Sequence, residues 1–262
     1  MTIARMNYVA RDRGRPRYYA NDHSKDRVVI AANEVQLIDG RMQPTSLDTH
    51  GFELIHHVSG VTDFRDPVAL GKQYRNEIQQ LVIARTGAKH VSVSGPGIVR
   101  YSERSNLAGT LNNSMPARFA HVDISDSTAE QFAKRSAPEW DYSRCAAFNL
   151  WRVFTPPPQD VPLAVCDART VSSDDLILSD AIFDEPDGSE WSFESLTVAC
   201  NPAHQWYWFS DMTRDELIMF VTNDSDHSRP HSVPHCAFDC PLTAAAAAPR
   251  GSIEMRVTCY WD

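Results

Sequence analysis

From residue 91 onward the chain consists mainly of short segments in which polar and apolar residues alternate between turn-forming residues. A repeat of two residues is typical of a β-strand whose two faces meet different surroundings. We expect strands at residues 91–94, 97–102, 118–123, 145–154, 162–166, 194–200, 205–210, 216–221 and 252–260. Many short strands of even spacing predict a mainly β chain, folded as one β-barrel or jelly-roll domain.

Residues 1–60 suggest further short strands around Tyr18, 28–30 and 35–38, and a helix with clear end signals follows them. Asp66 can cap this helix, Pro67 suits its first turn, and Gly87 fits its C-terminus. Between these ends the residues at one helical face are apolar: Leu70, Tyr74, Ile78, Leu81 and Val82. A shorter helix is expected at 128–136, with Ser127 and Glu130 as its capping box. The prediction is one domain over residues 1–262, in which 1–90 supply N-terminal strands and a supporting helix around a core at 91–262.

The composition excludes several classes of partner. With a net charge of −9 and a pI near 5.5, the chain lacks the basic surface that DNA or RNA binding requires. It has no apolar run approaching the roughly 18 residues of a membrane span. Its first residues are polar and basic, without the apolar stretch of a secretory signal, so we expect a cytoplasmic protein. Nothing in the composition excludes assembly into a homo-oligomer.

The tripeptide His121-Val122-Asp123 is the strongest local signal for chemistry. On a strand, alternate side chains share a face, so His121 and Asp123 would point together into the barrel. An imidazole and a carboxylate in this arrangement are two of the three ligands of the facial triad that binds non-haem Fe(II). That triad leaves coordination positions open for a co-substrate and dioxygen.

The third metal ligand must come from a distant strand. His235 lies in a short strand-like segment entered from a loop, which favours it over His231 and His227 in the polar run before it. An alternative is a zinc cluster in which Cys236 and Cys240 join His231 and His235. No second Cys/His pair stands at the spacing of a zinc finger, which weighs against this alternative.

Arg256 belongs to the strand expected at 252–260, on the face opposite Ile253, Met255 and Val257. A guanidinium on the inner face of a barrel needs an anion beside it, because an unpaired buried charge is costly. The distal carboxylate of 2-oxoglutarate would supply that anion through two parallel hydrogen bonds. Pairing of Arg256 with Glu254 or with another carboxylate is the structural alternative.

Several segments, in order along residues 100–260, together resemble one family. They are His121–Asp123, 148–152 (FNLWR), 162–168 (PLAVCDA), 206–212 (WYWFSDM) with Asp215-Glu216, Asp224-Ser225, 234–238 (PHCAF) and 252–256 (SIEMR). The chain is similar to the Fe(II)/2-oxoglutarate-dependent hydroxylases and desaturases that include the cephalosporin 7α-methoxylation protein, the aspergillic-acid hydroxylase and the gibberellin desaturase.

The resemblance implies a double-stranded β-helix (jelly-roll) core with a few packing helices. It also implies Fe(II) at His121, Asp123 and His235, and 2-oxoglutarate at Arg256. By the same resemblance Asn149, Arg152 and Tyr101 lie near the pocket. The expected reaction is dioxygen-dependent hydroxylation, desaturation or rearrangement of a small natural product of secondary metabolism.

Two other kinds of protein share this type of fold. One is a cupin-like metalloenzyme, an isomerase or dioxygenase that does not use 2-oxoglutarate and needs no inner arginine. The other is a non-catalytic jelly-roll binding module whose tryptophans and tyrosines form a ligand surface. The segments expected to form the pocket or its lid are 1–60, 104–116 and 180–192, and their composition does not name a ligand.

Overall fold

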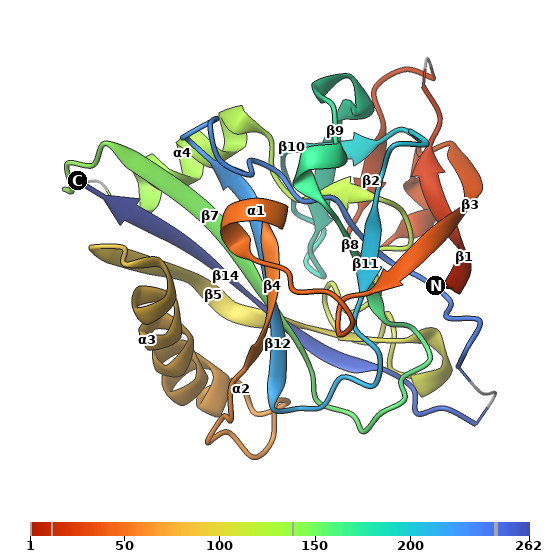
Figure 1. Cartoon of the computed structure of the whole chain (residues 1–262), viewed down its shortest axis with the longest axis horizontal. Coiled ribbons are helices and arrows are strands. Elements are labelled where there is room, and N and C mark those ends of the chain that lie inside the picture. The colour runs from red at the N-terminus through yellow and green to blue at the C-terminus, as the bar shows by residue number, and fades with distance from the viewer. Residues whose placement is uncertain (1, 12, 138, 244–245) are drawn as a thin grey trace.

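A computed structural model describes residues 2–11, 13–137, 139–243 and 246–262, and in these ranges the chain forms two β-sheets (Figure 1). In spatial order the nine-stranded sheet contains β1 (Thr2–Val9), β3 (Ile30–Asp39), β11 (Trp206–Trp208), β8 (Leu163–Cys166), β13 (His235–Ala237), β6 (His121–Val122), β10 (Glu190–Val198), β9 (Leu176–Asp184) and β2 (Arg17–Tyr19). The five-stranded sheet contains β4 (Phe52–His56), β12 (Glu216–Asp224), β7 (Arg144–Val153), β14 (Gly251–Trp261) and β5 (His90–Tyr101).

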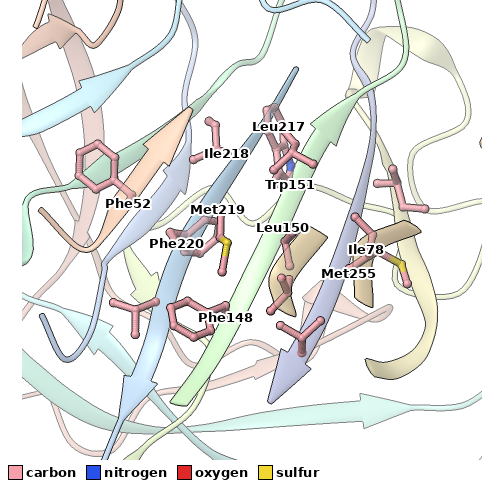
Figure 2. Packing of buried hydrophobic residues seen from close by; sticks show 14 of the residues in the cluster. Phe52, Ile78, Phe148, Leu150, Trp151, Leu217, Ile218, Met219, Phe220 and Met255 are labelled. Carbon is pink, nitrogen blue, oxygen red and sulfur yellow. The ribbon is translucent and has the colours of Figure 1, made fainter. Parts of the chain in front are cut away.

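The two sheets pack against each other through a shared apolar layer. Leu163 and Val165 of the nine-stranded sheet belong to the same buried cluster as Trp151, Phe220 and other residues of the five-stranded sheet. Figure 2 shows the contribution of β4, β12, β7 and β14 to this cluster. Two mainly antiparallel sheets packed face to face are the architecture of a jelly roll. The predicted fold class is therefore confirmed.

The first predicted helix is confirmed, and it covers the outer face of the five-stranded sheet (Figure 1). It runs through α2 (Pro67–Ala69), a π-helical segment η2 (Leu70–Tyr74) and α3 (Arg75–Thr86). The Asp66 side chain accepts a hydrogen bond from the Val68 amide, and Gly87 ends the helix with a φ of 65°. Short helical turns elsewhere are α1 (Leu47–His50), η1 (His23–Lys25), η3 (Glu103–Ser105), η4 (Ala168–Thr170) and η5 (Ser173–Asp175). None of the helices described is long and apolar enough to cross a membrane.

The second helix begins earlier than predicted. It is α4 (Asp126–Ser136), and its cap is Ser125, whose side chain accepts a hydrogen bond from the Thr128 amide. The predicted capping box of Ser127 and Glu130 is wrong because Ser127 already lies inside the helix, whereas Ser125 has the extended backbone of a cap. Glu130 instead forms a salt bridge with Lys134 one turn later. The helix therefore starts only three residues after Asp123.

Most predicted strands are present, with three differences. The segments 91–94 and 97–102 form one strand, β5, in which a bulge at residues 95–97 shifts the register against β14. Strand β1 was not predicted because its sequence was interpreted as a polar terminus. Its residues Ala4, Met6 and Tyr8 nevertheless alternate with more exposed ones and are buried. Strand β9 was missed because it falls in a segment interpreted as a loop. It pairs with β10, and this hairpin forms a wall of the cavity described below.

The packing of α3 generates a matched test of core stability. Val82 is fully buried against the five-stranded sheet, whereas Val68, in the same helical segment, is 64% exposed. Val82→Ala should lower the free energy of unfolding by about 2 kcal/mol, because it removes buried methyl groups and leaves a cavity. Val68→Ala should change it by less than ~0.5 kcal/mol. Urea denaturation of both variants measures the difference, and equal effects would contradict the packing described.

Candidate metal centre

Two histidines face each other across neighbouring strands. His121 on β6 and His235 on β13 are register partners, and their ring centroids lie 4.2 Å apart. Both side chains are buried, with 7% and 4% of the residue surface exposed. Chain segments separated by more than a hundred residues thus bring two imidazoles to one point between the sheets.

The hydrogen bonds of the two histidines fix which ring nitrogen is free. The Nδ1 atom of His121 lies 2.9 Å from the Phe119 carbonyl oxygen, and that of His235 lies 3.3 Å from the Val233 carbonyl oxygen. A carbonyl oxygen can only accept, so Nδ1 donates in both rings and carries the proton. The Nε2 lone pairs are therefore free for a metal ion, with the imidazoles oriented as metal ligands usually are.

Asp123 completes the cluster, and its two carboxylate oxygens have different partners. Its Oδ1 atom lies 3.5 Å from His121 Nε2 and 3.7 Å from His235 Nε2. Its Oδ2 atom accepts a hydrogen bond of 2.6 Å from the Asn149 side chain and lies 3.1 Å from the Arg256 guanidinium. Oδ1 thus remains free to join the two Nε2 atoms as a third ligand, with all three ligand atoms within 4.8 Å of one another.

The electrostatic surroundings favour the protonation states that metal binding requires. Burial alone would raise the pKa of the Asp123 carboxyl, but Arg256 and the two imidazoles outweigh it and hold that pKa well below its usual range. Burial, together with the neighbouring His235, lowers the pKa of His121. At neutral pH the cluster therefore contains a carboxylate and a neutral His121, as a divalent metal ion needs.

Two cavities meet at Asp123 and Arg256. The smaller, of about 350 Å³, is lined by Arg100, Tyr18 and Phe119, in addition to His121, Asp123 and Arg256. The larger, of about 830 Å³, lies beside Asn149 and has a mainly apolar wall that includes Ile98, Leu111, Phe132, Phe183, Trp191 and Phe193. Part of this wall comes from segments 104–116 and 180–192, which the sequence indicated as pocket or lid. The cluster thus borders a small cavity and a large one, each lined by apolar side chains together with a few charged ones.

Of the predicted pocket residues, the structure brings Asn149 and Arg256 to the cluster but not Arg152 or Tyr101. Arg152 is fully buried on the other face of β7, where its guanidinium donates to the Tyr74 hydroxyl and to backbone carbonyls. Tyr101 packs edge-on against Phe154 and lines neither cavity. Asn149 and Arg152 are three residues apart on one strand, so they cannot both face inward.

The alternative metal ligands lie elsewhere. His231 and His227 form a separate group with Asp126 at the surface. Cys236 and Cys240 are buried in a second apolar cluster, which also contains Trp206 and Phe238. Neither thiol belongs to a metal-type group among the described residues. His235 is therefore the histidine that the fold places beside His121 and Asp123.

The sequence analysis missed two inner arginines. Arg100 donates to the carbonyl oxygens of Asn113 and Met115, and no described carboxylate forms a salt bridge with it. Arg250 donates to the Val161 carbonyl oxygen, but its buried Nε has no partner among the described residues. Burial lowers the pKa of both guanidinium groups, that of Arg250 to about 9. The period-two pattern could have indicated Arg100, because it lies on the face opposite Tyr101.

The comparison with known proteins agrees with this geometry. A family model described as "Oxidoreductase/YMDC permease-like domain" matches residues 6–260. The hydroxylase/desaturase CTB9 of Cercospora beticola is 31% identical over 83% of this chain and 72% of its own length. The alpha-ketoglutarate-dependent dioxygenase phiK of a fungal species is 30% identical over 85% and 82%. The structure of the iron and alpha-ketoglutarate-dependent endoperoxidase NvfI superposes with a TM-score of 0.81 at 24% identity, covering 99% of this chain and 97% of that one.

A jelly roll with two histidines and a carboxylate converging between its sheets defines the class of non-haem metal oxygenases. The chain belongs to the oxidoreductase family matched over residues 6–260, together with hydroxylases/desaturases and 2-oxoglutarate-dependent dioxygenases of fungi. The resemblance inferred from the sequence is thereby confirmed. Membership of this family favours the oxygenase over the cupin-like isomerase and over the non-catalytic binding module.

The position of Arg152 generates a prediction about stability. Arg152→Met should lower the free energy of unfolding by about 3 kcal/mol, because buried carbonyl and hydroxyl partners lose their donor. Arg65→Met is the control, since it removes an exposed arginine whose salt bridge among the described residues is with Asp63, and it should leave stability nearly unchanged. Urea denaturation measures both. If Arg152→Met instead left stability unchanged and weakened co-substrate binding, Arg152 would belong to the pocket after all.

Proposed function

We propose that this protein is an oxygenase that binds Fe(II) through His121, Asp123 and His235 and uses 2-oxoglutarate to oxidise a small natural product. The observation that carries the proposal is the convergence of two Nε2 atoms and one carboxylate oxygen within 4.8 Å. Two neutral imidazoles and one carboxylate are the donor set that non-haem Fe(II) oxygenases use, with three positions left open. The relatives named as Fe(II)/2-oxoglutarate-dependent or alpha-ketoglutarate-dependent dioxygenases support the same metal and co-substrate.

We infer that residues 1–262 act as one oxygenase domain. Strands β1, β2, β3 and β4 all come from the first 90 residues, and they extend the two sheets that carry the site. Asn7 of β1 and Tyr18 of β2 also line the smaller cavity. The N-terminal part therefore contributes to the pocket as well as to the scaffold.

The protein's own residues orient the metal ligands and exclude water. Phe119 and Val233 hold the imidazoles through their carbonyl oxygens, and Asn149 and Arg256 hold Asp123 through its second oxygen. Fe(II), 2-oxoglutarate and dioxygen would together supply the oxidising chemistry: one oxygen atom would be used in oxidising the co-substrate to succinate and carbon dioxide, and the other would remain for the substrate. Phe220 packs on the ring of His235 with centroids 4.8 Å apart, which shields that ligand from solvent.

The smaller cavity suits the dianion 2-oxoglutarate, with its distal carboxylate held by arginine. Arg256 faces this cavity, but Asp123 and Glu254 already pair with it and raise the pKa of its guanidinium despite burial. Arg100 faces the same cavity without a carboxylate partner among the described residues. We therefore propose that Arg256 binds the co-substrate as the sequence suggested, and that Arg100 supplies the uncompensated positive charge.

The larger cavity suits an apolar substrate. Its volume of about 830 Å³ lies near the upper end of small-molecule sites, and aromatic side chains form much of its wall. Relatives with names such as gibberellin desaturase and aspirochlorine biosynthesis protein support a natural product of secondary metabolism. The net charge of −9 argues against a nucleic acid as substrate. Hydroxylation, desaturation and rearrangement all remain compatible with this site.

Metal binding gives the first test. His121→Ala, Asp123→Ala or His235→Ala should each abolish turnover and the weak visible absorption band that anaerobic Fe(II) and 2-oxoglutarate produce together. Asn149→Ala, which removes only the hydrogen bond to Asp123, should weaken Fe(II) binding by about 10–100-fold. His231→Ala should leave the band in place. If His231→Ala removed the band while His235→Ala kept it, the assignment of the third ligand would be wrong.

Co-substrate binding gives the second test. Arg256→Lys and Arg100→Lys keep the charge but lose the planar pair of donors, so each should raise the apparent KM for 2-oxoglutarate by ~10-fold or more. Fe(II) affinity should fall much less in Arg100→Lys, because that side chain does not contact a ligand. Arg250→Lys is the comparison variant, since Arg250 lines neither cavity. If the apparent KM for 2-oxoglutarate rose only in Arg250→Lys, the co-substrate carboxylate would instead be assigned to Arg250, whose Nε has no partner among the described residues.

A further inference from the structure

A second group of ligand-type side chains lies at the surface, apart from the buried centre. Asp126 is the first residue of α4, and His227 and His231 lie in the connection between β12 and β13. One potential ligand atom from each residue lies within 4.8 Å of the other two. Unlike the buried triad, this group is open to solvent: Asp126 and His227 are exposed and His231 is half-buried.

The hydrogen bonds of His231 favour a cation next to its ring. Its Nδ1 atom lies 2.6 Å from the Asp224 carbonyl oxygen, which can only accept, so Nδ1 carries a proton. Its Nε2 atom lies 2.8 Å from the Oδ1 atom of Asp126. In a neutral imidazole that Nε2 is an acceptor, and two acceptors at this distance repel each other. The Asn223 amide nitrogen lies 3.5 Å from the same Nε2 atom and is only a distant donor to it, so a proton or a metal ion between Nε2 and Oδ1 would relieve this repulsion.

His227 offers a further nitrogen ligand beside His231. Its ring is stacked on that of His231, with centroids 4.3 Å apart and planes at 22°. The lone pair of an imidazole nitrogen lies in the ring plane, so rotation of the exposed His227 side chain would turn that nitrogen toward a metal ion bound next to His231 and Asp126. Asn223 donates a hydrogen bond of 2.8 Å to the same Oδ1 atom and so fixes the carboxylate toward the histidines.

We propose that Asp126, His227 and His231 bind a second divalent transition-metal ion of the class to which Zn²⁺ belongs. Two imidazoles and one carboxylate, with water at the remaining position, match the nitrogen and oxygen ligands that Zn²⁺ accepts. Bonds of about 2.0–2.2 Å in tetrahedral geometry separate neighbouring ligand atoms by roughly 3.3 Å. Small rotations of these accessible side chains are enough to reach that spacing.

A metal ion at this position would stabilise the two chain segments that carry the buried ligands. Asp126 follows Asp123 by three residues, and His231 precedes His235 by four. The surface ion would thus link the same two segments that supply ligands to the buried site. The connection that carries the two histidines is otherwise held at the surface by salt bridges of Arg229 with Asp48 and Asp226, which solvent screens.

Counting bound ions tests the proposal directly. Metal-free protein is dialysed against low micromolar free Zn²⁺, and bound zinc is measured by elemental analysis. The wild type should bind two ions, one at each cluster, and His227→Ala combined with His231→Ala should bind one. His121→Ala should also bind one and should retain the surface ion. His56→Ala, which removes an exposed histidine outside both groups, should still bind two.

Thermal unfolding and a conservative variant add a second readout. Zn²⁺ at a hundredfold excess over its Kd should raise the Tm of the His121→Ala protein by roughly 5 °C, and the additional loss of His227 and His231 should abolish this rise. Asp126→Asn keeps the side-chain shape and should weaken zinc binding in the His121→Ala background by ~10-fold or more. If the double surface variant binds as much zinc as the wild type, the proposal is overturned. A single ion that is lost with the surface histidines but kept in His121→Ala supports it, even if the buried centre fails its own test.

Discussion

The candidate metal centre depends on the Asp123 carboxylate, whose two oxygens interact with side chains of different sheets. Asp123 follows β6 in the nine-stranded sheet, where its Oδ1 atom faces the two imidazoles, while its Oδ2 atom is bound by side chains of β7 and β14 in the other sheet. Asn149 and Arg256 are direct register partners, so the pairing of β7 with β14 delivers both donors to one oxygen. The apolar layer between the sheets therefore sets the geometry of the ligands as well as the stability of the fold.

The distribution of charge inside the barrel follows from the same arrangement. Arg256 is compensated by Asp123 and Glu254, whereas Arg100 and Arg250 donate mainly to carbonyl oxygens. Placing three guanidinium groups in a protein interior is costly unless anions accompany them. Of these three groups, Arg100 is the one that faces the smaller cavity without a carboxylate partner among the described residues, which is why the proposed binding of an anionic co-substrate there depends on it.

Sequence patterns predicted those features that depend on local periodicity. The alternation of His121 with Asp123, the short strand around His235 and the caps at Asp66 and Gly87 were each readable from neighbouring residues. Features set by long-range register were not. The placement of Arg152 and Tyr101 near the pocket rested on the resemblance alone. The alternation of side chains along β7 and β5 turns both residues toward the outer face of the five-stranded sheet. Strand β9 was not predicted because it is identified by its pairing with β10 and not by its own composition.

The bulge in β5 restricts which side chains one wall of the larger cavity can accommodate, whereas the opposite wall is less restricted. Gly97, at a φ of 94°, lies so close to β14 that a Cβ atom there would be 2.7 Å from the Met255 sulfur. A side chain at position 97 would therefore be strained both by this contact and by the positive φ. The opposite wall carries exposed side chains such as Trp191 on the β9–β10 hairpin and Leu111 in the loop before β6. Redesign of selectivity is accordingly better directed to the hairpin and the loop than to position 97 of the bulged strand.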